Sequence, residues 1–213
     1  MTDKFTDLMV DIETLGKVPG VVVLSIGLCA FNRYGLVNGL SEMESVTLRL
    51  SILPQTARGL VIDPDTMLWW MNQSAEARSD WASDEAQMTA GLPSDQLFVM
   101  ENWINSRCIM TPWAWANSPQ FDFSILQPLY RIAGRSFPWA YWQERDIRTL
   151  GAVHSDVKRP KPALAHSAAS DAEAQALWVQ RIFAKIAGKD ANVEANDPDG
   201  PVLSEPSDVR RAS

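Results

Sequence analysis

The sequence predicts an α/β protein whose mixed sheet, an antiparallel N-terminal meander plus parallel strands, is flanked by helices. Two observations predict this class. The first fifty residues hold three apolar or alternating segments joined by turn-forming residues, which is typical of consecutive antiparallel strands. The rest of the sequence alternates helical patterns with a further strand-like segment, and that alternation is typical of helices packed against a sheet.

Three strands are expected in the N-terminal part. Residues 8–10 form a short apolar strand, residues 21–31 are rich in β-branched and apolar side chains, and residues 45–50 alternate in polarity. Glycine, proline and asparagine predict turns at residues 14–20 and 32–35. Because short turns join strands that lie side by side, we expect an antiparallel meander.

The middle of the sequence is expected to be helical. One helix is predicted to start near Thr66, with Asp65 as its N-terminal cap, and to continue through an apolar segment. A second helix is predicted further along, with Ser94 or Asp95 as its cap. Both predictions depend on an oxygen-bearing side chain placed just before a run of apolar residues at helical spacing.

The remainder is expected to contain one more strand, three helices and a tail. Residues 108–115 form the strand, and a helix with apolar side chains at helical spacing follows it and ends at Gly134. Residues 142–153 and 170–187 form the other two helices. The composition then turns polar, so we expect one domain over residues 1–187 and a flexible acidic tail over residues 188–213.

Composition limits the classes of protein that this chain can represent. Hydrophobic residues make up 46% of its 213 residues, enough for a buried core, and the formal charge is −7. Proteins that coat nucleic acid carry a basic face, so this acidic chain does not fit that class, but a nuclease with an acidic metal site is not excluded. No signal peptide or membrane span is visible, so a soluble cytoplasmic protein with buried Cys29 and Cys108 thiols is expected.

Four acidic residues are candidate site residues because they lie at the ends of predicted elements. Asp11 and Glu13 follow the first strand, and side chains two residues apart on a strand point to the same side. Asp122 opens the helix after the fourth strand, and Asp171 lies at the start of the last helix. Each of them alone is as well explained by a solvated strand end or by the helix dipole. Together, four carboxylates in one place would require divalent cations to offset their repulsion.

One histidine, His166, precedes the last predicted helix. It lies five residues before Asp171, about 500° of helical rotation, so the two side chains would not share a face of one helix. We therefore expect His166 in the loop and Asp171 in the first turn, with Ser170 and Glu173 forming a capping box. A surface histidine beside a helix start is the plainer interpretation of His166 taken alone.

The order of these residues resembles the DEDDh 3′–5′ exonucleases, the DnaQ-like branch of the ribonuclease H-like superfamily. The segments that carry the resemblance read DIET at residues 11–14, WANSPQFD at residues 115–122 and HSAASDAEAQA at residues 166–176. The resemblance extends over residues 5–187 and is nearest to phage-type 3′–5′ exonucleases and to bacterial exoribonuclease-like domains. It implies a ribonuclease H-like fold and a metal-dependent phosphodiester hydrolase.

The resemblance also implies a role for each site residue. It implies two Mg²⁺ or Mn²⁺ ions, and hard oxygen ligands suit both. Asp11 would bridge the ions, Glu13 and Asp171 would complete the position that holds the attacking water, and Asp122 would support the second ion. His166 would orient and deprotonate that water, a role that an imidazole with a near-neutral pKa can fill.

The turn after the first strand is implied to bind substrate. In the family this turn lies against the terminal nucleotide, so Thr14 would bond the sugar and Leu15 would wedge against the base, with Gly16 in the same turn. An ordinary turn explains these residues equally well. Trp69 or Trp70 is a further candidate for stacking on a base, although most of the nine tryptophans are expected in the core.

A basic stretch precedes the histidine motif. Residues 131–161 carry seven basic residues against three acidic ones, and four consecutive residues read KRPK at 158–161. A basic loop beside an acidic site can guide a phosphate backbone. A solvated surface loop is an equally good interpretation.

The sequence thus predicts a two-metal-ion 3′–5′ exonuclease that releases nucleoside 5′-monophosphates from single-stranded 3′ ends, with DNA slightly favoured over RNA. A 3′–5′ exoribonuclease is the alternative within this class. A non-catalytic nucleic-acid-binding protein on the same fold and a metal-dependent hydrolase of nucleotides are alternatives from outside it. Homodimer formation is expected from the resemblance, because related enzymes are often dimers.

Overall fold

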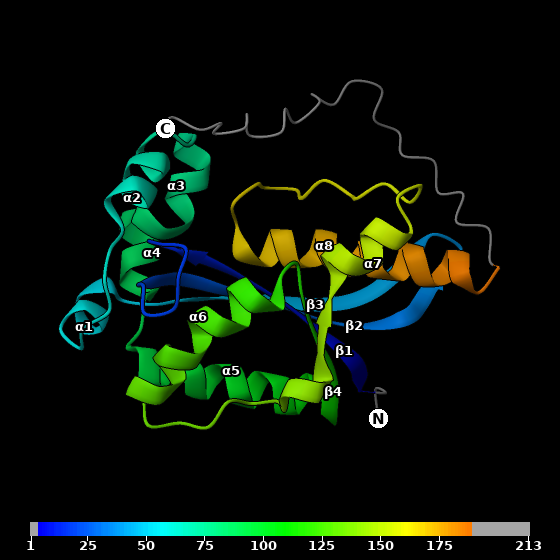
Figure 1. Ribbon diagram of the computed structural model, residues 1–213, viewed down its shortest axis with the longest axis horizontal. Helices are drawn as coiled ribbons and strands as arrows, with labels where there is room; N and C mark the ends of the chain where they lie inside the picture. Colours follow the sequence, from blue (N-terminus) through cyan, green and yellow to red (C-terminus); the bar gives the residue numbers. More distant parts are fainter. Residues whose placement is uncertain (1–3, 189–213) are drawn as a thin grey trace, which may run out of the picture.

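The computed structural model describes residues 4–188 of the chain as one mixed sheet with helices on both faces (Figure 1). The five strands lie in the order β3-β2-β1-β4-β5. The predicted α/β class is confirmed. The strand bounds are β1 (Phe5–Thr14), β2 (Val23–Val37), β3 (Leu40–Arg49), β4 (Cys108–Ala116) and β5 (Glu144–Asp146).

The N-terminal meander forms as predicted, but one of its turns is displaced. β1 pairs with β2 and β2 with β3 in antiparallel fashion, whereas β4 and β5 add to β1 in parallel. The turn predicted at residues 32–35 is wrong, because these residues continue β2 through an irregular register. Asn32 accepts a hydrogen bond from the Thr6 backbone N–H at 2.9 Å, and this contact holds the segment in the sheet. The true turn is at Asn38 and Gly39, both with positive φ.

Within residues 4–188, nine helical segments connect and cover these strands. Their bounds are α1 (Ile52–Thr56), α2 (Pro64–Met71), α3 (Ala75–Ala82), α4 (Asp84–Thr89), α5 (Pro93–Arg107), α6 (Pro119–Ile132), the 3₁₀ helix η1 (Tyr141–Gln143), α7 (Ile147–Val153) and α8 (Ala168–Ile186). Of these, the short helices α1, α3 and α4 were not expected from the sequence. In α6 and α8 the apolar residues recur at helical spacing, and this spacing predicted both helices.

Several predicted helix ends are wrong by a few residues. The cap of α2 is Asp63 rather than Asp65, because Pro64 takes the first helical position and the Asp63 carboxylate accepts the Asp65 N–H at 3.3 Å. Proline likewise starts α5, so neither Ser94 nor Asp95 caps it. The predicted Ser170–Glu173 capping box is also absent, since both residues lie within α8.

The predicted helix over residues 142–153 is instead three elements. Residues 142–143 belong to the 3₁₀ helix η1, residues 144–146 form β5, which pairs with the end of β4, and residues 147–153 form α7. Three residues are too few to show a period in the sequence. This short strand is nevertheless important, because it places the start of α7 next to the end of β4.

The two faces of the sheet are covered by different helices. Leu8, Val10 and Ile12 of β1 point into the main core with α5 and α6. Met9, between them, points to the opposite face and packs with apolar residues of α8 and α7. This alternation is the two-residue period of a strand. Asp11 and Glu13 follow Met9 in the same period and therefore face α8.

The remaining expectations concern cysteines, membrane and tail. Cys29 and Cys108 are free and buried, as predicted. In the part of the chain that the structure describes, no helix is long and apolar enough to cross a lipid bilayer. The predicted tail, residues 188–213, lies outside the described residues except for Gly188.

Candidate active site

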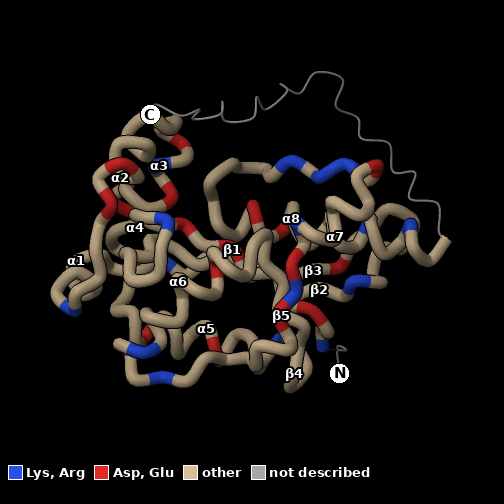
Figure 2. The backbone as a smooth tube through the Cα atoms, in the orientation of Figure 1, with Lys and Arg blue, Asp and Glu red and all other residues tan. Residues whose placement is uncertain are grey.

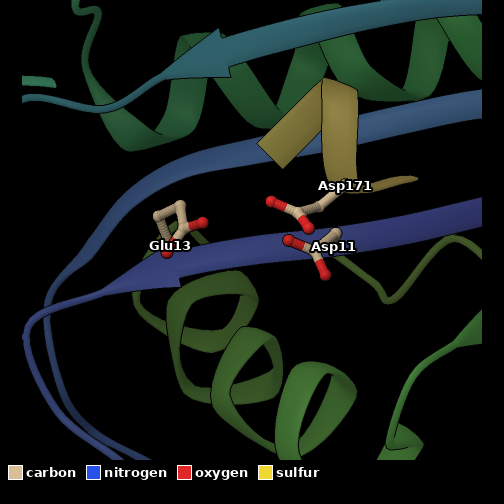
Figure 3. A group of neighbouring side chains, drawn as sticks. All are labelled: Asp11, Glu13 and Asp171. Carbon is tan, nitrogen blue, oxygen red and sulfur yellow. The ribbon is translucent and has the colours of Figure 1, made fainter. Parts of the chain in front are cut away.

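Three carboxylates meet where β1 passes beneath the first turn of α8. One oxygen from each of Asp11, Glu13 and Asp171 can be chosen so that the three lie within 4.8 Å of one another. Figure 3 shows Asp171 reaching down from α8 toward Asp11, with Glu13 two residues further along β1. Three of the four predicted acidic residues are thus in a single cluster.

A glycine allows α8 to come this close to the sheet. Gly27 of β2 lies opposite Asp11 in the antiparallel ladder. A β-carbon on Gly27 would be 2.0 Å from the backbone carbonyl carbon of Ala168, the first residue of α8. The helix N-terminus therefore rests directly on the β2 backbone, and this contact brings Asp171 over Asp11.

The fourth acidic residue, Asp122, lies beside the cluster but outside the group of three. It is 3% exposed in the first turn of α6, and its carboxylate accepts the backbone N–H of Ser118 at 3.2 Å. Its charge nevertheless acts on Asp11. Of the neighbouring charges that raise the Asp11 pKa, that of Asp122 has the largest effect. Asp122 is thus a close neighbour on the α6 side.

The cluster is electrostatically unfavourable without a cation. Burial raises the pKa of Asp11 well above its ordinary value, and the charges of Asp122, Glu13 and Asp171 raise it further. Burial, followed by the charge of Asp171, raises the pKa of Glu13 to about 8, and burial raises that of Asp122 to about 7. Burial also raises the pKa of Asp171. Such shifts are expected where like charges are held together away from water.

His166 lies at the rim of this cluster. It precedes α8 in a turn with a φ of 62°, an uncommon conformation for a residue other than glycine. Its backbone N–H donates to Asp171 Oδ2 over 2.9 Å, which holds the turn in this form. The imidazole lies edge-on to the ring of Trp69, with 5.1 Å between centroids, and 6.1 Å from that of Trp70. The predicted placement of His166 in the loop and Asp171 in the first turn is confirmed.

A cavity of about 200 Å³, open to solvent, adjoins the cluster on the α2 side. Glu13, Thr14 and Gly16 line one wall, and Trp69 lines another. Of the two tryptophans considered from the sequence, Trp69 has 43% of its surface exposed and Trp70 only 1%. Leu15 is fully buried in the main core and does not line the cavity, so contact between Leu15 and a base would require this turn to rearrange.

Sequence reasoning missed one polar residue of the site, Gln175. Its side-chain amide donates to Asp11 Oδ1 over 2.7 Å, and the residue is 1% exposed. Gln175 follows Asp171 by four residues, so the two lie on one face of α8. That spacing was a signal in the sequence, but a glutamine in a helical apolar stripe does not by itself indicate chemistry.

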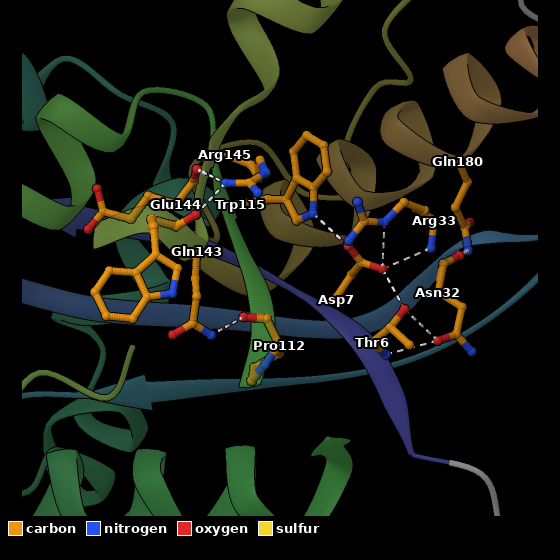
Figure 4. A network of polar contacts seen from close by, with 11 residues as sticks. Thr6, Asp7, Asn32, Arg33, Pro112, Trp115, Gln143, Glu144, Arg145 and Gln180 are labelled. Carbon is orange, nitrogen blue, oxygen red and sulfur yellow. Dashed lines mark hydrogen bonds and ion pairs between the residues drawn. The ribbon is translucent and has the colours of Figure 1, made fainter. Parts of the chain in front are cut away.

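Asp7 also lies buried on the α8 face of β1, but it belongs to a separate network (Figure 4). Arg33 forms an ion pair with it at 2.6 Å, and the Trp115 indole N–H donates to it at 2.8 Å. The guanidinium of Arg33 also lies over the Trp115 ring. Because its charge is compensated inside the protein, Asp7 differs from the site carboxylates, whose charges are not.

The donor set fits a hard divalent cation. Carboxylate oxygens are the ligands that Mg²⁺ and Mn²⁺ prefer, and raised carboxylate pKa values indicate a site that lacks compensating positive charge. The Gln175 Oε1 atom is buried and has no hydrogen-bond partner among residues 4–188, which adds another hard oxygen beside Asp11. The residues present therefore suit such an ion.

Comparisons with known proteins agree with this geometry. The model of a family described as the 3′–5′ exoribonuclease Rv2179c-like domain matches residues 6–183. The exodeoxyribonuclease of Enterobacteria phage T4 is 30% identical over 162 residues, which are 67% of this chain and 69% of the phage protein.

Solved structures share the fold. Pop2p of S. pombe, in a form with Mg²⁺ and Mn²⁺ bound, has a TM-score of 0.52 at 16% identity, over 89% of this chain and 86% of Pop2p. The nuclease domain of 3′hExo, described as a DEDDh family member bound to rAMP, has a TM-score of 0.51 at 8% identity, over 86% of this chain and 95% of that domain. At these identities the likeness supports the ribonuclease H-like fold alone.

Proposed function

Because the chain belongs to the Rv2179c-like family of 3′–5′ exoribonuclease domains, within the DEDDh exonucleases, we propose that it releases nucleoside 5′-monophosphates one at a time from single-stranded 3′ ends. The observation that carries this proposal is the cluster of Asp11, Glu13 and Asp171 beside His166. The nearby cavity supports an end-on mode of binding, because it opens to solvent beside Glu13 of the cluster and the Trp69 ring lines it.

The four carboxylates are proposed to hold two Mg²⁺ or Mn²⁺ ions. The charges of all three other carboxylates, Glu13, Asp171 and Asp122, act on Asp11, so it is the residue suited to both ions. When bound, the ions supply positive charge that stabilises the phosphate and favours deprotonation of the attacking water. Gln175 keeps the Asp11 carboxylate in one orientation through its hydrogen bond.

His166 is proposed to be the general base. It accepts the proton of the water that attacks the last phosphodiester, and the 3′-oxygen of the preceding nucleotide then leaves. The fixed turn at His166 supports this role, since its backbone is anchored to Asp171 and its ring rests against Trp69. An imidazole held in one place from two sides loses little freedom when it takes part in the reaction.

Thr14 and Gly16 are proposed to contact the sugar, and Trp69 the base, because all three line the cavity. The threonine hydroxyls of the cavity donate within the protein, Thr14 to the Gly16 carbonyl at 2.6 Å and Thr66 to Asp63 at 2.6 Å, so neither proton is reserved for a 2′-hydroxyl. A site without a dedicated partner for a 2′-hydroxyl discriminates weakly, whereas one built to bond a hydroxyl discriminates by about 10⁴-fold or more.

We therefore propose that both sugars are accepted, with DNA slightly favoured and a difference below about tenfold in kcat/KM. The test is a ladder assay on 5′-labelled single strands of the same sequence in DNA and in RNA, with Mg²⁺, with Mn²⁺ and with EDTA. Stepwise shortening from the 3′ end of both strands is expected with either ion. Complete rejection of one sugar would contradict the proposal of weak discrimination.

The same assay separates the other candidate activities. A nucleotide hydrolase would leave the strands intact and hydrolyse free nucleotides, and a binding protein would retard the strands without shortening them. Release of nucleosides or of 3′-monophosphates would contradict the proposed direction of cleavage. Homodimer formation and a cytoplasmic location remain predictions from the sequence.

A further inference from the structure

Two exposed arginines lie on the α7 side of the α8 N-terminus, whereas α2 lies on the other side. Arg148 belongs to α7, and Arg159 lies in the loop that connects α7 to α8. The basic residues of this loop appear in Figure 2 as a blue stretch running over α8. In Figure 1, α2 lies to the left of the N-terminal end of α8 and α7 lies to the right. Residues of α2, Trp69 among them, line the cavity.

Arg148 is placed by the short strand β5. Asp146, the last residue of β5, pairs with Ala116 at the end of β4, so the first turn of α7 lies beside the turn that leads into α6. That same turn contains Ser118, which bonds the Asp122 carboxylate. Burial raises the pKa of Asp122, and the positive charge of Arg148 opposes the rise, which is consistent with this position.

Arg159 is placed by a tryptophan of α8. Its guanidinium carbon lies over the Trp178 ring, 5.9 Å from the centroid, and the Trp178 indole N–H donates to the Val157 carbonyl at 2.8 Å. Trp178 is seven residues after Asp171, which is about two helical turns along one face. Burial raises the pKa of Asp171, and the positive charge of Arg159 opposes the rise.

The same indole also holds α7. A β-carbon on Gly151 would lie 2.2 Å from the Trp178 ring, so the backbone of α7 packs directly on the ring. One side chain thus connects the helix that carries Arg148 with the loop that carries Arg159. The two arginines come from separate segments, yet their positions depend on one contact surface.

Neither guanidinium forms an ion pair at contact distance with a carboxylate of residues 4–188. Within residues 4–188, ion pairs at 4.0 Å or less occupy Arg33, Arg49, Arg107 and Arg135, but neither Arg148 nor Arg159. Both side chains are exposed. Exposed arginines without a carboxylate partner, beside a site for phosphodiesters, have the chemistry to bind a phosphate through two parallel N–H donors.

We propose that Arg148 and Arg159 bind the non-scissile phosphate next upstream of the cleaved bond, and that Trp178 is the residue that positions them. This inference rests on the proposed function. The cavity receives the terminal nucleotide and the carboxylates receive the scissile phosphate, so the preceding chain leaves on the α7 side, where both arginines lie. These contacts fix the register of the strand but carry no base specificity.

The experiment compares two substrates that differ in upstream phosphates. One is a single-stranded oligonucleotide, and the other is the p-nitrophenyl ester of thymidine 5′-monophosphate, which has one phosphodiester and nothing upstream. For the double variant Arg148→Gln/Arg159→Gln, the ratio of kcat/KM for the oligonucleotide to that for the ester should fall about tenfold or more. The slope of log KM against log salt for the oligonucleotide should decrease by about 0.7 for the lost phosphate contact.

Arg131→Gln is the matched control, because Arg131 is exposed at the far end of α6 and should leave the ratio as in the wild type. Trp178→Phe keeps a ring against Gly151 but loses the bond to Val157, and should raise the oligonucleotide KM more than it changes kcat. Equal losses on both substrates in the double variant, which leave the ratio unchanged, would overturn the inference, since the arginines would then act on the carboxylates. Wild-type activity of the double variant on both substrates would also overturn it, whereas a wild type that cleaves neither substrate would refute the proposed function itself.

Discussion

The side-chain amide of Gln175 donates a hydrogen bond to Asp11 Oδ1 over 2.7 Å, from within the buried face of α8. Burial and the charges of the three other site carboxylates all raise the pKa of Asp11. The amide favours the ionised form and opposes that rise. A residue that is not one of the five DEDDh residues thus helps to keep the central carboxylate ionised and in a fixed orientation.

Replacement of this amide should weaken the site without unfolding the protein. Gln175→Met has nearly the same length but cannot donate, so activity at limiting Mn²⁺ should fall by about 10- to 100-fold, the usual effect of losing a partner of a metal ligand. The measurement is kcat/KM as a function of Mn²⁺ concentration. The buried glutamine Gln180, further along α8, provides the control Gln180→Met. Equal activity of both variants at every Mn²⁺ concentration would show that the bond to Asp11 has no role in catalysis.

Replacement of His166 should separate catalysis from folding. His166→Asn is preferable to alanine, because asparagine tolerates the φ of 62° found here. We expect kcat to fall by about 10²- to 10⁴-fold, the effect of losing a general base. Thermal stabilisation by Mn²⁺ should persist, since the carboxylates remain. His166→Ala should lose the same activity with an additional loss of stability.

The other histidine of the chain, His154, caps α7 outside the cluster and gives the control His154→Asn. Wild-type turnover of His166→Asn, or an equal loss in both variants, would remove His166 from the mechanism.

Without divalent ions, the protein should become less stable as the pH rises. Burial raises the pKa of Glu13 to about 8 and that of Asp122 to about 7. Carboxyls in the unfolded chain titrate near pH 4, so between these limits the folded protein holds protons that the unfolded chain has released. Raising the pH removes them and lowers the free energy of unfolding. Mn²⁺ should reverse this loss.

The measurement is the Tm in EDTA and in Mn²⁺ at about pH 6 and about pH 8.5, on either side of the shifted pKa values. The gain in Tm from Mn²⁺ should be larger at the higher pH, and Asp11→Asn should have a smaller gain. A Tm in EDTA that rises between the two pH values would contradict this reading of the cluster.

Gly27 should be required for the approach of α8. In Gly27→Ala, the new β-carbon would be 2.0 Å from the Ala168 carbonyl carbon, so the helix must move away from the sheet and take Asp171 with it. Overpacking of this kind typically costs about 1–3 kcal/mol, and activity should be lost. Gly91→Ala is the control, because its β-carbon would meet only the flexible side chain of Gln96. Full activity in Gly27→Ala would mean that the helix position does not set the site.

The sequence could predict those features that depend on chain order. The strand carrying Asp11 and Glu13, and the loop and helix carrying His166 and Asp171, follow from local patterns, and the family match confirms the resemblance that they suggested. The predictions that were wrong concern segments whose structure depends on contacts with residues distant in the sequence. The segment at Asn32 reads as a turn, but its bond to Thr6 keeps it in β2.

The same limit applies to the site. The need for glycine at position 27 is visible only when α8 lies on β2, and Gln175 appears as one more residue of a helix until its contact with Asp11 is seen. The positions of Arg148 and Arg159 depend on β5 and on the Trp178 indole. Neither of these features has a signal in the sequence. Local patterns identify the residues with chemistry, and the packed helices determine which neighbours support them.

The most direct measurement is the ladder assay repeated on Asp11→Asn with a 5′-labelled single strand and Mn²⁺. Asp11 contributes to every proposed ion position, and asparagine preserves its size while removing its charge. We expect the wild type to shorten the strand nucleotide by nucleotide from the 3′ end, and Asp11→Asn to leave it intact while keeping a folded Tm. Comparable shortening by Asp11→Asn, or by the wild type in EDTA, would contradict the claim that these carboxylates hold the catalytic ions.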